Sequence, residues 1–233
     1  NMSHDIRTPM NAIVGMTAIA QANMDKPDQV ASCLQKIALS SKHLLGLIND
    51  VLDMSKIESG KLTLRVDTVA RRETVESMVS ISQAQVEGKG QRSDVLIQNV
   101  TRENVLCDGV RLNQVLLNLL SNALKFTPEG GSITMSVSQE PSPRGEDLVR
   151  THFQVRDTGI GMSEEFQKKI FDSFAREDST RVQRTEGTGL GMAITKYIVD
   201  EMEGTITVSS RKGEGSCFRV TLDLPVVSRE EQE

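Results

Sequence analysis

The sequence predicts an α+β protein in two parts, a helical hairpin over residues 1–59 and a domain of mixed helices and strands over residues 60–227. In the first part, apolar residues recur three or four positions apart, which is typical of amphipathic helices. After Gly60, several segments instead alternate apolar and polar residues, which is typical of half-buried strands. Residues 228–233 form an acidic tail, for which we expect no regular structure.

The composition favours an aliphatic core and excludes some partners. Hydrophobic residues make up 37% of the 233 residues but aromatic residues only 3%, so the core must consist of Leu, Ile, Val and the ten Met. The net charge of −5 speaks against a nucleic-acid partner, which would require a basic surface. Cys33, Cys107 and Cys217 lack metal-binding spacing, and we interpret them as reduced thiols of a cytosolic protein.

No apolar run in the sequence is long enough to span a bilayer, and no signal peptide is recognisable. The chain opens at Asn1, directly before a histidine motif that is described below. We therefore interpret it as the cytoplasmic portion of a longer protein, with any sensor or membrane anchor outside this fragment.

Each helix of the predicted hairpin has recognisable ends. The first covers residues 1–24, and a turn leads to Asp28, which we expect to cap the second. Ser59 and Gly60 end the second helix, because glycine accepts the left-handed conformation that closes many helices. This helix carries an apolar stripe formed by Leu34, Ile37, Leu44, Ile48 and Val51. Two helices cannot cover such a stripe alone, so we expect a homodimer with a four-helix bundle.

The second part opens with a predicted strand at 62–66, a helix at 71–87 and a strand at 95–100. Asp108 should cap a strongly amphipathic helix that ends at Phe126. The remaining elements are predicted in chain order as strands at 133–137 and 148–155, helices at 163–172 and 190–202, and strands at 205–210 and 216–224.

The hairpin begins with the segment Ser3-His4-Asp5-Ile6-Arg7-Thr8-Pro9-Met10. Apolar residues continue beyond it at helical spacing, so His4 should lie on an exposed helix face. A neutral imidazole has a usable lone pair near pH 7, and the Asp5 carboxylate could hold the other ring nitrogen and strengthen the nucleophile. On these residues alone, a solvent-facing histidine without a function is the open alternative.

The predicted helix 108–126 has an unusual polar side opposite its apolar stripe. This side carries Arg111, Gln114, Asn118, Asn122 and Lys125. Asparagine is a poor residue for a helix interior, so two of them one turn apart need a reason. Their amide oxygens could bind Mg²⁺ while the lysine meets a phosphate, although a solvated polar face would explain the pattern equally well.

Two glycine-rich segments follow. Asp157-Thr158-Gly159-Ile160-Gly161-Met162 comes directly after a strand, where a carboxylate could accept from an exocyclic amine such as that of adenine. Gly187-Thr188-Gly189-Leu190-Gly191 opens a helix and offers backbone N–H donors to phosphate. Simple turns are the alternative for both. The polar stretch 175–186 between them resembles a lid.

In their order and spacing, these motifs resemble the two-domain catalytic core of sensor histidine kinases of two-component systems, over essentially the whole chain. The resemblance implies an α/β sandwich domain with a mixed, mostly antiparallel sheet and helices on one face, with ATP and Mg²⁺ as cofactors. It also implies autophosphorylation and transfer to an aspartate of a response-regulator receiver domain, and it allows a phosphatase activity toward that regulator.

The resemblance assigns roles to the residues of the hairpin motif. His4 would be the phosphoacceptor, Asp5 its base, and Thr8 would help to orient water during dephosphorylation of the partner.

It assigns roles to the second domain as well. Asn118 and Asn122 would contact Mg²⁺ and phosphate beside Lys125, and Asp157 would read adenine. The other residues implied in nucleotide binding are Gly159, Gly161, Phe174 (after Phe171), Arg176, Gly187, Thr188, Gly189, Leu190 and Gly191. Ala175 departs from the family pattern, because an aromatic residue often follows the second phenylalanine.

Two other functions are compatible with parts of the sequence. One is an ATPase of the same superfamily that drives a conformational clamp, and the other is a nucleotide-binding scaffold without catalysis. The hairpin motif argues against the first, and the intact Asn118, Asn122 and Asp157 argue against the second.

Overall fold

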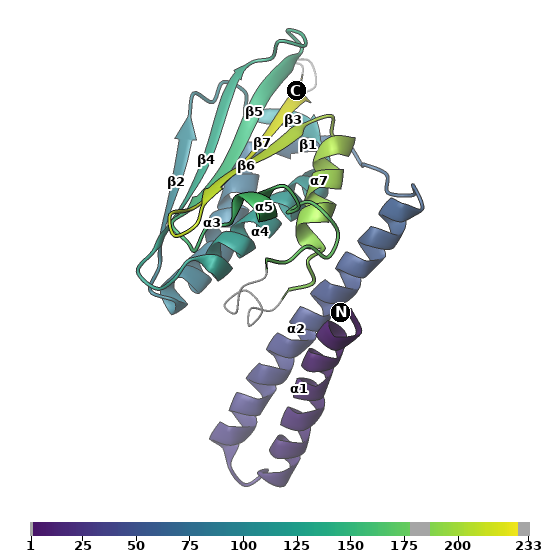
Figure 1. Cartoon of the computed structure of the whole chain (residues 1–233), viewed down its shortest axis with the longest axis vertical. Helices are drawn as coiled ribbons and strands as arrows, with labels where there is room; N and C mark the ends of the chain where they lie inside the picture. Colours follow the sequence, from purple (N-terminus) through teal and green to yellow (C-terminus); the bar gives the residue numbers. More distant parts are fainter. Residues whose placement is uncertain (1, 178–186, 228–233) are drawn as a thin grey trace.

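The computed structural model describes residues 2–177 and 187–227 (Figure 1). It consists of a long helical hairpin whose second helix leans against an α/β domain, as Figure 1 shows. The predicted acidic tail at 228–233 and the lid residues 178–186 lie outside the described residues.

The hairpin is formed by α1 (Met2–Ala22) and α2 (Pro27–Glu58). The expectation that Asp28 caps the second helix is wrong. Helix α2 already begins at Pro27, which needs no N–H partner at a first helical position, and Lys26 at the N-cap makes no side-chain cap bond. The expected end at Ser59 and Gly60 is confirmed, since Gly60 has φ +64 and Lys61 N–H donates to the carbonyl of Lys56 at 2.8 Å.

The central sheet of the second domain has the strand order β2-β4-β5-β7-β6. Its strands are β2 (Arg92–Gln98), β4 (Ser132–Pro141), β5 (Leu148–Asp157), β6 (Thr205–Arg211) and β7 (Gly215–Pro225). Only the β2–β4 pair is parallel, and the other pairs are antiparallel. The predicted mixed, mostly antiparallel sheet is therefore confirmed.

Helices cover one face of this sheet (Figure 1). They are α3 (Arg71–Gly88), α4 (Gly109–Phe126), the short α5 (Glu164–Gln167) and α7 (Gly191–Glu201). Helix α4 is capped as predicted, because the Asp108 carboxylate accepts from Arg111 N–H at 3.0 Å. The apolar stripe of α4 is buried against the sheet through Leu112, Val115, Leu116, Leu119, Leu120 and Ala123. Because this packing fixes the rotation of α4 about its axis, it also determines where the polar side of the helix faces.

Some predicted elements differ from the structure. Residues 62–66 form no strand, because their alternating side chains have no neighbouring strand to pair with; Val66 is exposed, and Arg65 N–H instead donates to Asp108 Oδ2 at 2.8 Å. The strand lies just after them, as β1 (Asp67–Ala70), and pairs with β3 (Asn104–Cys107). No strand was predicted at the position of β3. The helix that starts after Ser163 ends at Gln167 rather than at 172.

Helix α2 is fastened to the second domain along its last turns. Val51, Met54 and Ile57 pack against the buried core cluster of that domain. Asp53 Oδ2 accepts hydrogen bonds from Arg111 and Gln114 of α4, both at 2.8 Å. Burial would raise the pKa of Asp53, but these two hydrogen bonds and the positive charges of Arg111 and Lys56 hold it below its usual value. The hairpin and the second domain are thus joined by packing and by a shielded ion pair.

Candidate functional site

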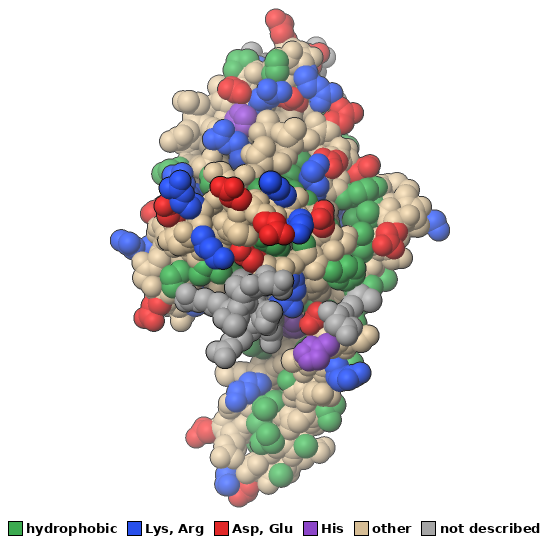
Figure 2. Space-filling model, viewed as in Figure 1, with side chains coloured by type: hydrophobic (Ala, Val, Ile, Leu, Met, Phe, Trp, Pro, Cys, Tyr) green, Lys and Arg blue, Asp and Glu red, His purple; other side chains and the backbone are tan. Residues whose placement is uncertain are grey.

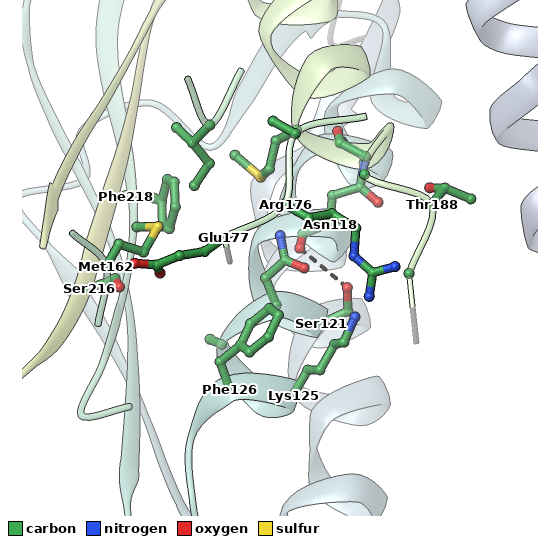
Figure 3. A pocket seen from close by; sticks show the side chains of 18 of the residues that line it. Asn118, Ser121, Lys125, Phe126, Met162, Arg176, Glu177, Thr188, Ser216 and Phe218 are labelled. Atoms are coloured by element: carbon green, nitrogen blue, oxygen red, sulfur yellow. Dashed lines mark hydrogen bonds between the residues drawn. The ribbon is translucent and has the colours of Figure 1, made fainter. Parts of the chain in front are cut away.

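A cavity of about 450 Å³ opens between α2, α4, the end of β5 and the start of α7. Figure 3 shows Met162, Ser216 and Phe218 at one end of it and Thr188 at the opposite end. Most of the predicted site residues line it: Asn118, Asn122, Lys125, Asp157, Gly161, Arg176, Gly187, Thr188, Gly189 and Gly191. The fold therefore brings both glycine-rich segments and the polar side of α4 to one place.

Asn118 lies on α4 where that helix faces the start of α7. Its amide nitrogen donates to the carbonyl of Gly191 at 3.1 Å and to Thr195 Oγ1 at 3.2 Å. Because these bonds engage the nitrogen, they fix the side chain and leave the amide oxygen as the group to offer a cation. Among the described residues, no cluster of three His, Cys, Asp or Glu side chains is placed to hold a metal. The amide oxygen of Asn118 itself fits a magnesium ion bound together with nucleotide phosphates, since Mg²⁺ takes oxygen ligands.

Lys125 lies two turns further along α4 than Asn118. Its ammonium is 5.0 Å from the centroid of the Phe126 ring, and a Cβ added at Gly187 would come within 2.7 Å of it. Glycine at 187 therefore lets the backbone of the turn approach the lysine closely. Figure 3 shows Arg176 above the same stretch of the cavity, so two cationic side chains border its middle.

Asp157 lies at the end of β5, where its side chain is buried. Burial raises the pKa of this carboxyl group above its usual value, although the backbone N–H groups of Gly159 and Ser216 donate to it and oppose the rise. The Gly159 bond is 2.8 Å long. This end of the cavity also contains the apolar side chains of Met162 and Phe218. A buried acceptor beside apolar surface suits a flat, amine-bearing ring.

The second glycine-rich segment forms a tight turn at the N-terminus of α7. Gly189 has φ +70, and its carbonyl accepts from Phe174 N–H at 2.9 Å. Thr188 Oγ1 accepts from Leu190 N–H at 3.1 Å and donates to Asp50 Oδ2 of α2 at 3.2 Å. The positive end of the α7 dipole therefore faces this end of the cavity, which suits an anion.

Three of the predicted nucleotide-binding residues do not line this cavity. Phe174 is 52% exposed and has φ +63, and Leu190 is buried in the core. Gly159 borders a shallower adjoining cavity with Glu177 and Lys212. Glu177 lines both cavities and accepts from Ser163 N–H at 3.1 Å.

Sequence reasoning missed the contribution of α2. Lys42, His43, Gly46, Leu47 and Asp50 line the cavity together with the residues of the second domain. The helical periodicity of α2 identified its apolar stripe but carried no signal for a cavity wall formed with another domain.

The hairpin motif lies outside the cavity, on α1. The His4 side chain is 75% exposed, and its Nδ1 is 3.7 Å from Asp5 Oδ1. Thr8 Oγ1 donates to the carbonyl of His4 at 3.1 Å. The imidazole is thus accessible to a reactant, with a carboxylate next to one of its two nitrogens.

Replacing Gly161 by alanine is expected to destabilise the second domain. Gly161 has φ +62, and an added Cβ would collide with the carbonyl oxygen of Arg211. Gly213 offers a matched control, because it has φ +83 but nothing lies within 4 Å of an added Cβ. Backbone strain alone costs about 1–3 kcal/mol, so thermal unfolding should show a clearly larger loss for Gly161→Ala than for Gly213→Ala. Equal losses would contradict the close packing described here.

Comparison with known proteins adds to this geometry. Residues 107–226 match the family described as "Histidine kinase-, DNA gyrase B-, and HSP90-like ATPase". Residues 1–60 match the "His Kinase A (phospho-acceptor) domain". Within the described part of the chain, no helix is long and apolar enough to cross a membrane.

Individual relatives agree with both family matches. The sensor histidine kinase GacS of Pseudomonas protegens is 38% identical over 97% of this chain, which covers 24% of GacS. The autoinducer 2 sensor kinase/phosphatase LuxQ of Vibrio harveyi is 38% identical over 98% of this chain, which covers 26% of LuxQ. The chain thus spans about a quarter of the length of these relatives.

A solved structure shows the same architecture. Full-length ShkA in complex with AMPPNP superposes with a TM-score of 0.72 and 26% identity, over 97% of this chain and 45% of ShkA. The chain therefore belongs to the sensor histidine kinases and represents their catalytic core, a phosphoacceptor hairpin followed by an ATP-binding domain.

Proposed function

We propose that this chain is an ATP-dependent protein-histidine kinase that phosphorylates His4 and passes the phosphoryl group to an aspartate of a response-regulator receiver domain. The observation that carries the proposal is the cavity itself, which has a buried acceptor, Asp157, at one end and the Gly187–Gly191 turn at the other. In this arrangement the adenine amino group donates to Asp157, and the triphosphate extends toward the N-terminus of α7.

Cationic and amide side chains complete the phosphate end. Lys125 and Arg176 neutralise the terminal phosphates. Asn118 and Asn122 would hold magnesium through their amide oxygens, and this ion would supply further charge neutralisation for the phosphates. Phosphoryl transfer depends mainly on such placement and neutralisation, because little covalent chemistry is required of the protein.

His4 supplies the nucleophile. Asp5 lies nearest to Nδ1, so it takes up the proton there while Nε2 attacks the γ-phosphorus. A bond from nitrogen to phosphorus forms, the bond from the γ-phosphorus to its bridging oxygen breaks, and ADP leaves. Since His4 is not among the residues of the cavity, transfer within one chain requires the hairpin to move relative to the ATP-binding domain.

Exposed apolar side chains support a homodimer through the hairpin. Figure 2 shows hydrophobic side chains at the surface of the lower part of the hairpin. Along the whole hairpin, the exposed apolar residues include Met10, Val14, Ile19, Leu34, Leu39, Leu45, Ile48 and Leu52. A second hairpin would cover such a surface and complete a four-helix bundle.

The remaining assignments follow from the family. The receiver domain docks on the hairpin near His4. Thr8 orients water if the chain also dephosphorylates its regulator, an activity that the name sensor kinase/phosphatase indicates for LuxQ. In this proposal the chain is the cytoplasmic portion of a larger sensor, and any membrane anchor lies outside it.

Labelling with γ-³²P-ATP tests the proposed function. We expect incorporation into the protein that is lost in acid and retained in base, because a phosphoramidate behaves in this way. Release of labelled phosphate without labelled protein would instead identify an ATPase that drives a clamp. Nucleotide binding with neither product would identify a scaffold without catalysis.

A further inference from the structure

One side of α2 faces the ATP-binding domain throughout its last turns. Asp50, Asp53, Met54 and Ile57 occupy positions i, i+3, i+4 and i+7 and therefore share this side. Asp53 meets Arg111 and Gln114, and Ser173 Oγ lies 3.9 Å from Met54 Sδ. These contacts hold α2 in a docked position on the domain.

Within the docked interface, Asp50 alone of these residues lines the nucleotide cavity. Its carboxylate accepts from Thr188 Oγ1, which belongs to the turn that receives the triphosphate in the proposed function. Asp50 thus places a negative charge close to the proposed position of the triphosphate. It also occupies the Thr188 hydroxyl, a donor of the Gly187–Gly191 turn.

The other polar residues that α2 itself adds to the cavity do not relieve this conflict. Lys42 and His43 also line the cavity from α2, but they lie two turns away, about 11–12 Å along the axis at 1.5 Å per residue. Asp53 is the nearer charge and has the same sign as Asp50. Burial raises the pKa of Asp50, and the charge of Asp53 raises it further, while the Thr188 hydrogen bond opposes the rise. Keeping the Asp50 carboxylate ionised in the docked position therefore costs free energy.

We propose that Asp50 is a residue of the nucleotide site contributed by the hairpin, and that it makes docked α2 and the bound triphosphate compete for the Thr188 turn. The inference rests on the proposed function, because it assumes that this cavity binds ATP. Coupling between two binding events is reciprocal, so if docking of α2 weakens nucleotide binding, nucleotide binding weakens the docking of α2 by the same factor. Nucleotide binding then releases the hairpin, which is the movement that transfer to His4 within one chain requires.

The test measures the binding of AMPPNP and adenosine by calorimetry to the whole chain and to its variants. Asp50→Asn should bind AMPPNP about tenfold more tightly, within the range usual for coupled sites, but adenosine with unchanged affinity, because the competition acts on the phosphates. Asp25→Asn removes the same charge from the exposed turn of the hairpin and should change neither affinity. Asp50→Glu keeps the charge and should stay close to the unmodified chain.

Asp53→Asn provides an independent route to the same result. Its side chain lies outside the cavity, and weakening its bonds to Arg111 and Gln114 should undock α2 and also tighten AMPPNP binding severalfold. Unchanged or weaker AMPPNP binding in Asp50→Asn, or an equal gain for adenosine, would overturn the inference. If Asp50→Asn fails to fold, unchanged AMPPNP binding in Asp53→Asn overturns it. Failure of the unmodified chain to bind AMPPNP would refute the proposed function instead.

Discussion

Replacing His4 by glutamine is expected to reduce autophosphorylation to background while nucleotide affinity stays unchanged. Glutamine has a similar reach and hydrogen-bonding capacity, but its amide nitrogen lacks the lone pair that imidazole offers to phosphorus. The side chain is exposed on α1 and does not line the cavity, so its loss should leave ATP binding intact. Labelling with γ-³²P-ATP and calorimetry measure the two properties separately.

Two further samples sharpen this experiment. His152→Gln changes a histidine on β5 that pairs with Thr221 and Glu140, so it should retain the label. Mixing His4→Gln with Asn122→Ala restores label if heterodimers form and phosphorylation runs between protomers. Label that persists in His4→Gln alone would refute the assignment of the phosphoacceptor.

Replacing Asp157 by asparagine is expected to weaken ATP binding by about 10- to 150-fold, the equivalent of one hydrogen bond to a charged group. Asparagine retains an oxygen for Gly159 N–H but loses the charge that the adenine amino group would meet. Calorimetry with AMPPNP measures this loss, and an unchanged affinity would contradict the proposal that Asp157 binds the adenine amino group.

The same substitution should stabilise the empty protein slightly. Burial raises the pKa of Asp157, so the folded state binds its proton more tightly than the unfolded state does. The resulting stability is present below the unfolded pKa and is lost as pH rises through the folded pKa. At neutral pH the ionised carboxylate therefore costs stability, and Asp157→Asn should unfold at an equal or higher temperature. A lower unfolding temperature would show that its hydrogen bonds outweigh its burial.

Local signals in the sequence were sufficient for most of the fold. The apolar stripe of α4, its Asp108 cap and the glycine that ends α2 are decided within a few residues, and the structure has each of them. The failures depend on distant partners. Residues 62–66 alternate like a strand but have no strand beside them, whereas β3 is short and gains its partner, β1, only through the tertiary fold.

The site shows the same division. Residues within one motif, such as Asn118 and Asn122, lie where their helical spacing predicted, facing the cavity. Phe174 differs from this expectation, because it is exposed, has a positive φ and does not line the cavity. The wall supplied by Asp50 could not be found from periodicity, since it arises only from the way the two domains pack.

The ion pair between Asp53 and Arg111 has a mechanical consequence. Arg111 occupies the first turn of α4, and two turns further along the same helix Asn118 lines the cavity proposed to bind ATP. A push or rotation delivered to the hairpin from upstream would thus reach the phosphates through one stiff helix, with no flexible loop to absorb it.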